Sequence, residues 1–204
     1  MSISELWQYE QQALVAGYTM ICGCDEAGAG PLAGPVYAAA VILPFGLDIP
    51  GLTDSKKLTE KKREALFPVI KEKAVAWAVA SVDEKEIDAT DILSARMKAM
   101  QLAINALDVK ADFALIDGNR DKGKTSAVTT PHTCVIKGDS LSASIAAASI
   151  LAKVSRDHWM MDAAKEYPQY RFEQHKGYGT KLHYELLREH GPSPIHRRSF
   201  LKNL

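Results

Sequence analysis

Long apolar runs are absent from this sequence of 204 residues. No stretch reaches the roughly 18 or more apolar residues that a transmembrane helix needs. The first residues, MSISELWQYEQQA, also lack the basic segment and the apolar core of a signal peptide. The sequence has three cysteines, Cys22, Cys24 and Cys134, and an odd number cannot pair completely in disulfides. No fourth ligand stands at a spacing typical of a zinc site. These absences predict a cytoplasmic protein with reduced thiols.

An excess of charge of either sign is absent too, because 25 Lys and Arg balance 25 Asp and Glu. The global balance therefore identifies no class of partner. Along the chain the charges are uneven, since residues 171–204 carry seven Lys or Arg against three Glu, with four of the six histidines. A basic end of this kind indicates either nucleic-acid contact or an ordinary solvated surface.

Short apolar segments alternate with amphipathic ones along the chain. We expect strands within residues 20–25, 36–44, 74–82, 113–117 and 132–139, and helices over 4–16, 60–73, 92–107, 142–167 and 179–191. Thr59 and Asp91 are positioned to cap two of the helices, and Pro68 is expected to kink or interrupt the first of these. Strands that come first and helices that alternate later predict an α/β fold with a mixed sheet covered by helices.

The segment GCDEAGAGPLAGP, residues 23–35, permits two interpretations. From Gly28 it spells G-x-G-x-x-A, the letters of a dinucleotide-binding loop, which would predict a nicotinamide-dependent oxidoreductase. Such a loop must open a helix, whereas Pro35 and the VYAAAVIL that follows favour a strand. We favour the other interpretation, in which the glycines let backbone approach a ligand and the acids before them bind metal.

Acidic residues recur at one structural position. Asp25, with Glu26 beside it, ends one apolar strand, Asp117 ends FALID, and Asp139 follows CVIKG. Neighbouring strand ends meet at one edge of a sheet, and carboxylates gathered there repel one another unless hard cations neutralise them. Oxygen-only ligands suit Mg²⁺ or Mn²⁺, and two such ions support phosphodiester cleavage. The alternative is that each acid is only a turn former or a helix cap.

Six segments together resemble the bacterial ribonuclease HII family over nearly the whole chain. They are DEAGAGPLAGPV (25–36), DSKKL (54–58), IDGN (116–119), KGDSLSASIAAASILAKVSRD (137–157), HKGYGT (175–180) and HRRSF (196–200). The resemblance implies an RNase H-like fold, a mixed five-stranded sheet flanked by helices, with a helical C-terminal extension. It also implies that residues 1–204 form a single catalytic domain, with a core over about 18–165 and a helical, basic part over 166–204.

The activity that the resemblance implies is metal-dependent cleavage of RNA in RNA–DNA hybrids and of single ribonucleotides in duplex DNA. Cleavage falls 5′ of the ribonucleotide and leaves 3′-hydroxyl and 5′-phosphate ends, a reaction that removes ribonucleotides from DNA. The partners are therefore these nucleic acids, with no membrane and no obligatory protein partner evident. The related ribonuclease HIII is disfavoured, because about 20 residues before the first strand leave no room for its extra N-terminal domain and its glycine loop lacks the GPLAGP continuation.

The same resemblance assigns roles to individual residues. The metal-binding and catalytic acids are Asp25, Glu26, Asp117 and Asp139. Gly28 and Gly30 match the glycines of a G-R-G motif whose backbone contacts the 2′-hydroxyl at the RNA–DNA junction, and Tyr178 matches a tyrosine that stacks on the neighbouring sugar.

Further residues are candidates for phosphate contact. Lys56 and Lys57 lie in DSKKL, and Ser142 and Ser144 begin the long helix, where free N–H groups also favour anions. The alternatives stay open: DSKKL is equally a solvated turn, and the serines equally helix caps. Lys153 and Arg156 can likewise pair with Asp157 on the helix surface. His175 and His196 are expected to serve as scaffold or substrate edge rather than as metal ligands.

Ala29 departs from the family pattern, which has Arg between the two glycines. Loss of this cationic side chain predicts weaker substrate binding or an altered preference rather than lost hydrolysis. An alternative is a catalytically impaired, nucleic-acid-binding member of the same family. Retention of all four acids disfavours it, since a protein that only binds gains nothing from a costly anionic cluster.

Overall fold

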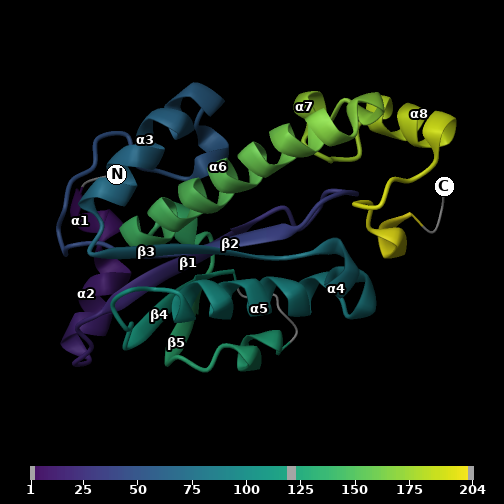
Figure 1. Ribbon diagram of the computed structural model, residues 1–204. Helices are drawn as coiled ribbons and strands as arrows, with labels where there is room; N and C mark the ends of the chain where they lie inside the picture. Colours follow the sequence, from purple (N-terminus) through teal and green to yellow (C-terminus); the bar gives the residue numbers. More distant parts are fainter. Residues whose placement is uncertain (1–2, 119–122, 202–204) are drawn as a thin grey trace.

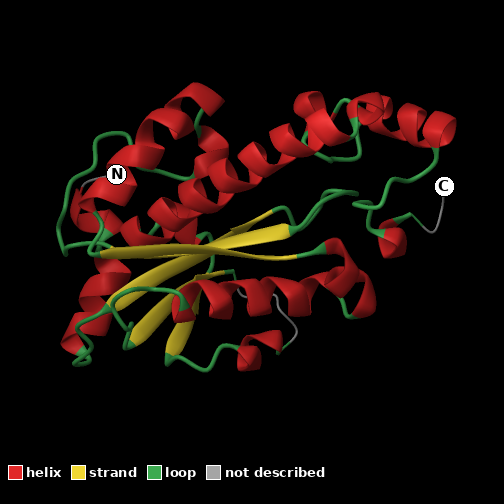
Figure 2. Ribbon diagram, viewed as in Figure 1, coloured by secondary structure: helices red, strands yellow, loops and turns green. Residues whose placement is uncertain are grey.

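A single mixed sheet forms the centre of the molecule, as a computed structural model covering residues 3–118 and 123–201 shows. Its five strands are β1 (Ile21–Ala27), β2 (Val36–Ile42), β3 (Ala76–Val82), β4 (Phe113–Asp117) and β5 (His132–Val135), in the order β3-β2-β1-β4-β5. β1, β2 and β3 are antiparallel neighbours, whereas β4 and β5 run parallel to β1 (Figure 2). The expected mixed five-stranded sheet is confirmed.

Helices cover both faces of the sheet. They are α1 (Ile3–Leu6), α2 (Gln8–Val15), α3 (Glu60–Lys73), α4 (Glu84–Ala89), α5 (Ile92–Asn105), α6 (Ala143–Glu166), α7 (Phe172–His175) and α8 (Lys181–His190). Figure 1 shows α6 and α3 on one side of the sheet and α5 on the other. Within the described parts of the chain, none of these helices combines the length and the apolarity needed to cross a membrane.

Several helix boundaries follow the sequence and others do not. The side chains of Thr59 and Asp91 cap α3 and α5 as expected. The predicted interruption at Pro68 is wrong, since α3 continues to Lys73. Pro68 lies on the exposed side of this helix, where a carbonyl that loses its partner can be hydrated. The helix expected over 4–16 is divided at Trp7, whose buried ring packs edge-on against Phe45.

Alternation along the strands divides the core into two layers. Ala38 and Ala40 of β2 pack with α5, whereas Ala39 and Val41, on the opposite face, pack with α6 and α3. Because these side chains are small, the helices approach the sheet closely. The approach is close enough at Gly23 that a Cβ atom would overlap the backbone of Ser144 and Ile145 at the start of α6.

The C-terminal part folds back on the segment after β1. Within this glycine loop (residues 28–35), Ala33 forms an isolated bridge with His196, and the Leu32 N–H donates to the Gly177 carbonyl at 2.8 Å. The loop leads directly into β2, and no helix begins within these eight described residues. The nicotinamide interpretation therefore lacks the helix N-terminus that would bind a pyrophosphate.

Candidate functional site

Three carboxylates converge at one edge of the sheet. Asp25 lies in β1, Asp117 ends the parallel neighbour β4, and Asp139 lies in the short 3₁₀ helix Gly138–Ser140. The pairing of Cys24 with Ile116 sets the two strand acids side by side. One carboxylate oxygen from each of the three acids lies within 4.8 Å of the others. The convergence expected from strand ends therefore holds for these three residues.

Glu26 occupies a different position from the one expected. Successive side chains of a strand point to opposite faces, so Glu26 faces α5 while Asp25 faces α6. Its Oε2 lies 2.9 Å from Nη2 of Arg96 on α5. The structure thus separates Glu26 from the cluster of three and holds it in an ion pair. Its charge remains close enough to raise the pKa of Asp25 and Asp117.

The three clustered acids are short of positive charge. Burial, followed by the charges of Glu26 and Asp117, raises the pKa of Asp25 well above its ordinary value. Burial also raises the pKa of Asp117 and Asp139, with a further contribution to Asp139 from the charge of Asp117. A divalent cation would relieve this repulsion, and the ligand set of oxygens alone suits a hard ion. The residues present therefore fit a magnesium- or manganese-type site.

A pocket of about 400 Å³ opens beside the acids and carries three lysines on its wall. Its lining consists of Asp54, Lys56, Lys57, Asp117, Lys137, Asp139 and Ser140. Lys56 Nζ lies 3.5 Å from Asp139 Oδ2, and Lys57 Nζ donates to Ser140 Oγ at 3.0 Å. Burial opposes the charge of Lys56, but the acids prevail and raise its pKa. Lys56 and Lys57 are both exposed, so they are available to a phosphate.

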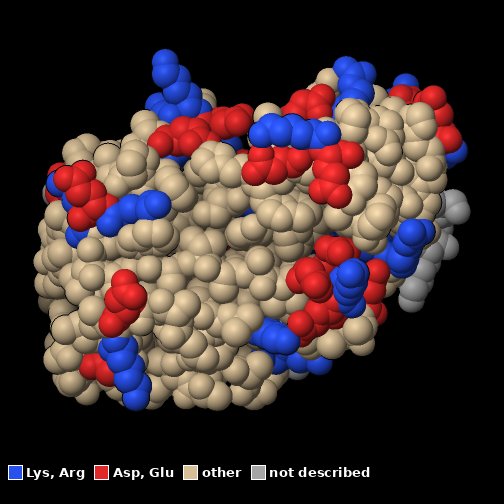
Figure 3. Space-filling view, in the orientation of Figure 1, with Lys and Arg blue, Asp and Glu red and all other residues tan. Residues whose placement is uncertain are grey.

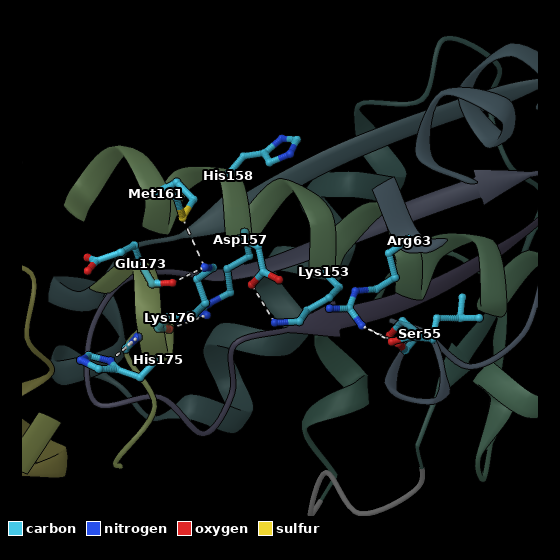
Figure 4. Close-up of polar contacts among 12 residues, drawn as sticks. Ser55, Arg63, Lys153, Asp157, His158, Met161, Glu173, His175 and Lys176 are labelled. Carbon is cyan, nitrogen blue, oxygen red and sulfur yellow. Dashed lines mark hydrogen bonds and ion pairs between the residues drawn. The ribbon is translucent and has the colours of Figure 1, made fainter. Parts of the chain in front are cut away.

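The turn that presents these lysines is anchored from two sides. Ser55 Oγ lies 2.6 Å from Ser149 Oγ of α6. Arg63 of α3 donates to the carbonyls of Ser55 and Leu58 at 3.0 and 2.6 Å, and Figure 4 shows Arg63 extending toward Ser55. DSKKL is consequently a braced turn that carries two exposed lysines, both directed toward the segment around Asp139.

The serines at the start of α6 do not face the substrate side. Ser142 and Ser144 are fully buried, at 0% and 1% exposure. Ser142 caps α6 by accepting from the Ile145 N–H, and its hydroxyl donates to buried Glu10 at 2.6 Å. The predicted phosphate contact is therefore wrong for both side chains, because α6 packs so closely on β1 that its first turn is enclosed. The capping alternative is confirmed for Ser142.

The two glycines of the motif differ in their surroundings. Gly28 has a positive φ of 95° and is buried, and a Cβ there would overlap the Arg156 side chain. Gly30 is exposed, with no atom within 4 Å of a Cβ position. Gly28 is thus needed for internal packing, whereas Gly30 offers open backbone. Ala29 lies between them, partly exposed, with its carbonyl bound to Arg197.

Tyr178 presents its ring close to this loop and is 40% exposed. Lys153 Nζ and Arg156 Cζ lie 5.6 and 5.7 Å from its ring centre. Lys153 forms the expected pair with Asp157, at 2.6 Å, which Figure 4 also shows. Arg156 does not form the expected surface pair, because it is fully buried and donates to backbone carbonyls instead.

Histidines of the C-terminal part form a buried cluster. His175 and His183 stack with ring centres 4.2 Å apart, and the Nε2 atoms of His183 and His196 lie 3.0 Å apart. Burial, together with the charge of His183, lowers the pKa of His196 to about 3. A buried, neutral cluster confirms the scaffold expectation for His175 and His196.

The sequence did not indicate two further residues that contact the site, Arg96 and Arg197. Arg96 could have been found from the strand period, which sends Glu26 to the α5 face. Arg197 stands in HRRSF beside the exposed Arg198 and carries no signal of its burial. Asn119 of IDGN lies outside the described residues. Acidic and basic side chains lie intermixed on the face drawn in Figure 3. This face therefore shows no broad patch of a single charge.

Known proteins resemble the chain over most of its length. The family model described as Ribonuclease HII matches residues 22–203. Ribonuclease HII of Idiomarina loihiensis is 57% identical over 181 residues, which are 89% of this chain and 95% of that protein. Ribonuclease HII of Desulfitobacterium hafniense is 54% identical over 198 residues, 97% of this chain and 75% of that protein.

Solved structures give the same match in three dimensions. Ribonuclease H2 from Pyrococcus horikoshii has a TM-score of 0.74 at 26% identity, covering 89% of this chain and 93% of the other. Ribonuclease HII from Archaeoglobus fulgidus, in a complex with PCNA, has a TM-score of 0.73 at 25% identity, covering 88% and 94%.

Proposed function

The chain belongs to the ribonuclease HII family, whose members are endoribonucleases of RNase H type, and from this premise we propose its specific reaction. It cleaves the RNA strand of RNA–DNA hybrids and single ribonucleotides embedded in duplex DNA. The cut falls 5′ of the ribonucleotide, leaving 3′-hydroxyl and 5′-phosphate ends, and serves to remove ribonucleotides from DNA. The observation that carries this proposal is the cluster of Asp25, Asp117 and Asp139.

Metal binding at this cluster follows from the ligand chemistry. Asp25, Asp117 and Asp139 would hold Mg²⁺ or Mn²⁺, with Glu26 completing a two-ion site once it leaves Arg96. The bound ions would supply an activated water and stabilise the leaving oxygen. Asp117 is oriented for this role by the Gly138 N–H, which donates to its Oδ1 at 2.7 Å. Lys56 and Lys57 bind the phosphates that flank the cut and so fix the register of the strand.

Discrimination of RNA from DNA is assigned to the surface next to the acids. The backbone of the segment from Gly28 to Gly30 contacts the ribose 2′-hydroxyl, and Tyr178 stacks on the adjoining sugar. Open space at Gly30 and the exposed ring of Tyr178 support this assignment. Ala29, in place of arginine, lacks a cationic contact, so we expect weaker binding with hydrolysis retained.

The test uses an end-labelled DNA duplex that contains one ribonucleotide. We expect cutting 5′ of that residue in Mg²⁺ or Mn²⁺ and none in EDTA. Asp25→Asn should abolish cutting while leaving duplex binding largely intact, because the change weakens metal binding and leaves the proposed substrate contacts of the glycine loop in place. Asp162→Asn is the matched control, since Asp162 is exposed and forms its ion pair, among the residues that the structure describes, with Lys165 on α6.

The outcomes separate the candidate functions. Tight binding without cutting in either metal would support the alternative, a catalytically impaired member of the family, to which Ala29 points. Near-normal cutting by Asp25→Asn would show that the metal assignment is wrong. Cutting 3′ of the ribonucleotide would refute the proposed reaction while leaving the acid site in place.

A further inference from the structure

Two arginines lie fully buried behind the glycine loop, Arg156 on α6 and Arg197 near the C-terminus, each with 0% exposure. In the described chain neither forms a salt bridge with a carboxylate. Burial, followed by repulsion from Arg156, lowers the pKa of Arg197 to about 9, which leaves it charged at neutral pH. A buried charge without a counter-ion is costly, so these side chains need an explanation.

Backbone carbonyls take the place of the missing counter-ions. Arg197 donates from Nε to Gly34, from Nη1 to Ala29 and from Nη2 to Gly28, at 2.9, 3.0 and 2.6 Å. Arg156 donates in the same way to the carbonyls of Pro35, Ala33 and Lys176, at 3.1, 3.1 and 3.0 Å. Five of the six carbonyls belong to the glycine loop, and the sixth lies two residues before Tyr178.

The direction of these carbonyls fixes the direction of the amides. In a trans peptide the C=O and the following N–H point to opposite sides, and the described chain has no cis bond. When Arg197 draws the Gly28 and Ala29 carbonyls inward, the N–H groups of Ala29 and Gly30 turn outward. No hydrogen bond within the described residues uses either N–H. Arg197 therefore holds two free donors toward the open side of the loop.

We propose that Arg197 and Arg156 are positioning residues for ribonucleotide recognition: Arg197 aims the Ala29 and Gly30 N–H groups at the ribose 2′-hydroxyl oxygen, and Arg156 holds Tyr178 in register with them. This inference rests on the proposed function and adds the buried groups through which the loop acts. Arg156 joins the two halves, because its guanidinium donates to the Lys176 carbonyl and also lies beneath the Tyr178 ring. The positive charges behind the amides further strengthen them as donors.

The position of Arg156 also explains why residue 28 is a glycine. The Arg156 side chain occupies the volume that a Cβ at Gly28 would need. Any other residue there would push the loop away from the arginine that anchors it.

The test compares affinities in EDTA, where no cutting occurs, for a duplex with one ribonucleotide and for the all-DNA duplex of the same sequence. Lysine keeps the charge but cannot hold three carbonyls in a planar fork. In Arg197→Lys the ratio of the two affinities should fall threefold or more, while Mg²⁺ binding by calorimetry stays within twofold. Arg198→Lys, one residue further on and exposed, is the matched control and should keep the wild-type ratio.

The results bear on the two proposals separately. A wild-type protein that shows no preference for the ribonucleotide would refute the proposed function. A wild-type preference that survives in folded Arg197→Lys, with a change below threefold, would overturn the positioning role. An equal fall in both affinities would also overturn it, because the amides would then be serving phosphate rather than the 2′-hydroxyl.

If Arg197→Lys does not fold, two further measurements decide. Arg156→Lys should lower the same ratio threefold or more. In the unmodified chain labelled with ¹⁵N-arginine, the duplex with one ribonucleotide should shift the slowly exchanging Nε–H signals of the buried arginines more than the all-DNA duplex does. Identical spectra with the two duplexes, or an unchanged ratio in Arg156→Lys, would overturn the inference.

Discussion

Acidification from pH 7 to pH 5 should lower the free energy of unfolding, because it favours protonation of buried histidines that form a chain of hydrogen bonds. The Ser193 N–H donates to His196 Nδ1, so neutral His196 carries its proton on Nε2 and donates it to His183 Nε2. His183 in turn donates from Nδ1 to the Tyr178 carbonyl. A further proton on either ring would set two N–H groups against each other. The neutral chain also ties the C-terminal segment to the residue proposed to stack on the sugar.

The magnitude follows from the shifted pKa values. Burial is the main cause that lowers the pKa of His183 to about 4 and that of His196 to about 3, against about 6.5 in an unfolded chain. At pH values between the folded and the unfolded pKa, each histidine binds more protons in the unfolded state than in the folded state. The free energy of unfolding therefore falls as the pH falls below about 6.5. At pH 5, about 1.5 pH units below the pKa of an unfolded histidine, each of the two residues lowers the free energy of unfolding by about 2 kcal/mol. Together they lower it by about 4 kcal/mol.

The clustered acids act in the opposite direction. The pKa values of Asp25, Asp117 and Asp139 are raised in the folded state, so the folded state takes up protons there as the pH falls and gains stability. The wild-type protein alone would therefore show only the net effect. A comparison with a histidine variant cancels the acids, because both proteins carry them.

Urea unfolding at pH 7 and pH 5 measures this difference. His196→Asn keeps an acceptor for the Ser193 N–H but has no ring to protonate. Its loss of unfolding free energy between the two pH values should be smaller than the wild-type loss by about 2 kcal/mol. His158→Gln, at an exposed site on α6, serves as the control. An equal loss in wild type and His196→Asn would refute the reasoning, as would ¹⁵N spectra that place the His196 proton on Nδ1.

Other perturbations test the remaining groups. Gly28→Ala should lower the free energy of unfolding by about 2 kcal/mol or more, because of its φ of 95° and its overlap with buried side chain. Gly30→Ala should cost less than about 0.5 kcal/mol, and equal costs in urea unfolding would contradict the packing role. Ala29→Arg should raise kcat/KM roughly 10- to 150-fold, which corresponds to about 1.5–3 kcal/mol of transition-state stabilisation, and unchanged constants would mean that the introduced side chain makes no useful contact. Arg96→Gln should release Glu26 and tighten Mg²⁺ binding up to about tenfold, about 1.4 kcal/mol, in calorimetry; weaker binding would show that the ion pair prepares Glu26 for the metal.

The sheet and its helices could be predicted because local signals agree with the final packing. Each strand is a short apolar segment, and Thr59 and Asp91 cap helices where the sequence places them. The convergence of Asp25, Asp117 and Asp139 followed from one topological rule about strand ends. Pro68 misled the prediction because the effect of a helical proline depends on whether the freed carbonyl faces water, which is a property of the tertiary structure.

The position of Glu26 shows where adjacency in sequence fails as a guide. Two neighbouring acids read naturally as one ligand pair, yet a strand sends them to opposite faces. The period-2 rule used to find the strand already contained this answer, and Arg96 on the facing helix completes it. The ion pair holds Glu26 beside Arg96, and the proposed two-ion site would require Glu26 to leave this partner. We therefore predict that metal affinity at the cluster depends on an arginine that contacts none of its three acids within salt-bridge distance, among the residues described here.

Burial of charged and polar residues was the feature that sequence could not supply. Ser142 and Arg197 read as surface residues, but both are enclosed by contacts with segments more than a hundred residues away. Gly23 allows α6 to approach β1 closely, and this approach encloses Ser142. The carbonyls of the glycine loop accept hydrogen bonds from Arg197. In each case a glycine or an exposed carbonyl elsewhere creates the site, so the fate of the polar residue is set by its neighbours in space. A motif match identifies such residues as belonging together, and only the packed structure distinguishes a group that touches the substrate from one that holds the backbone in place.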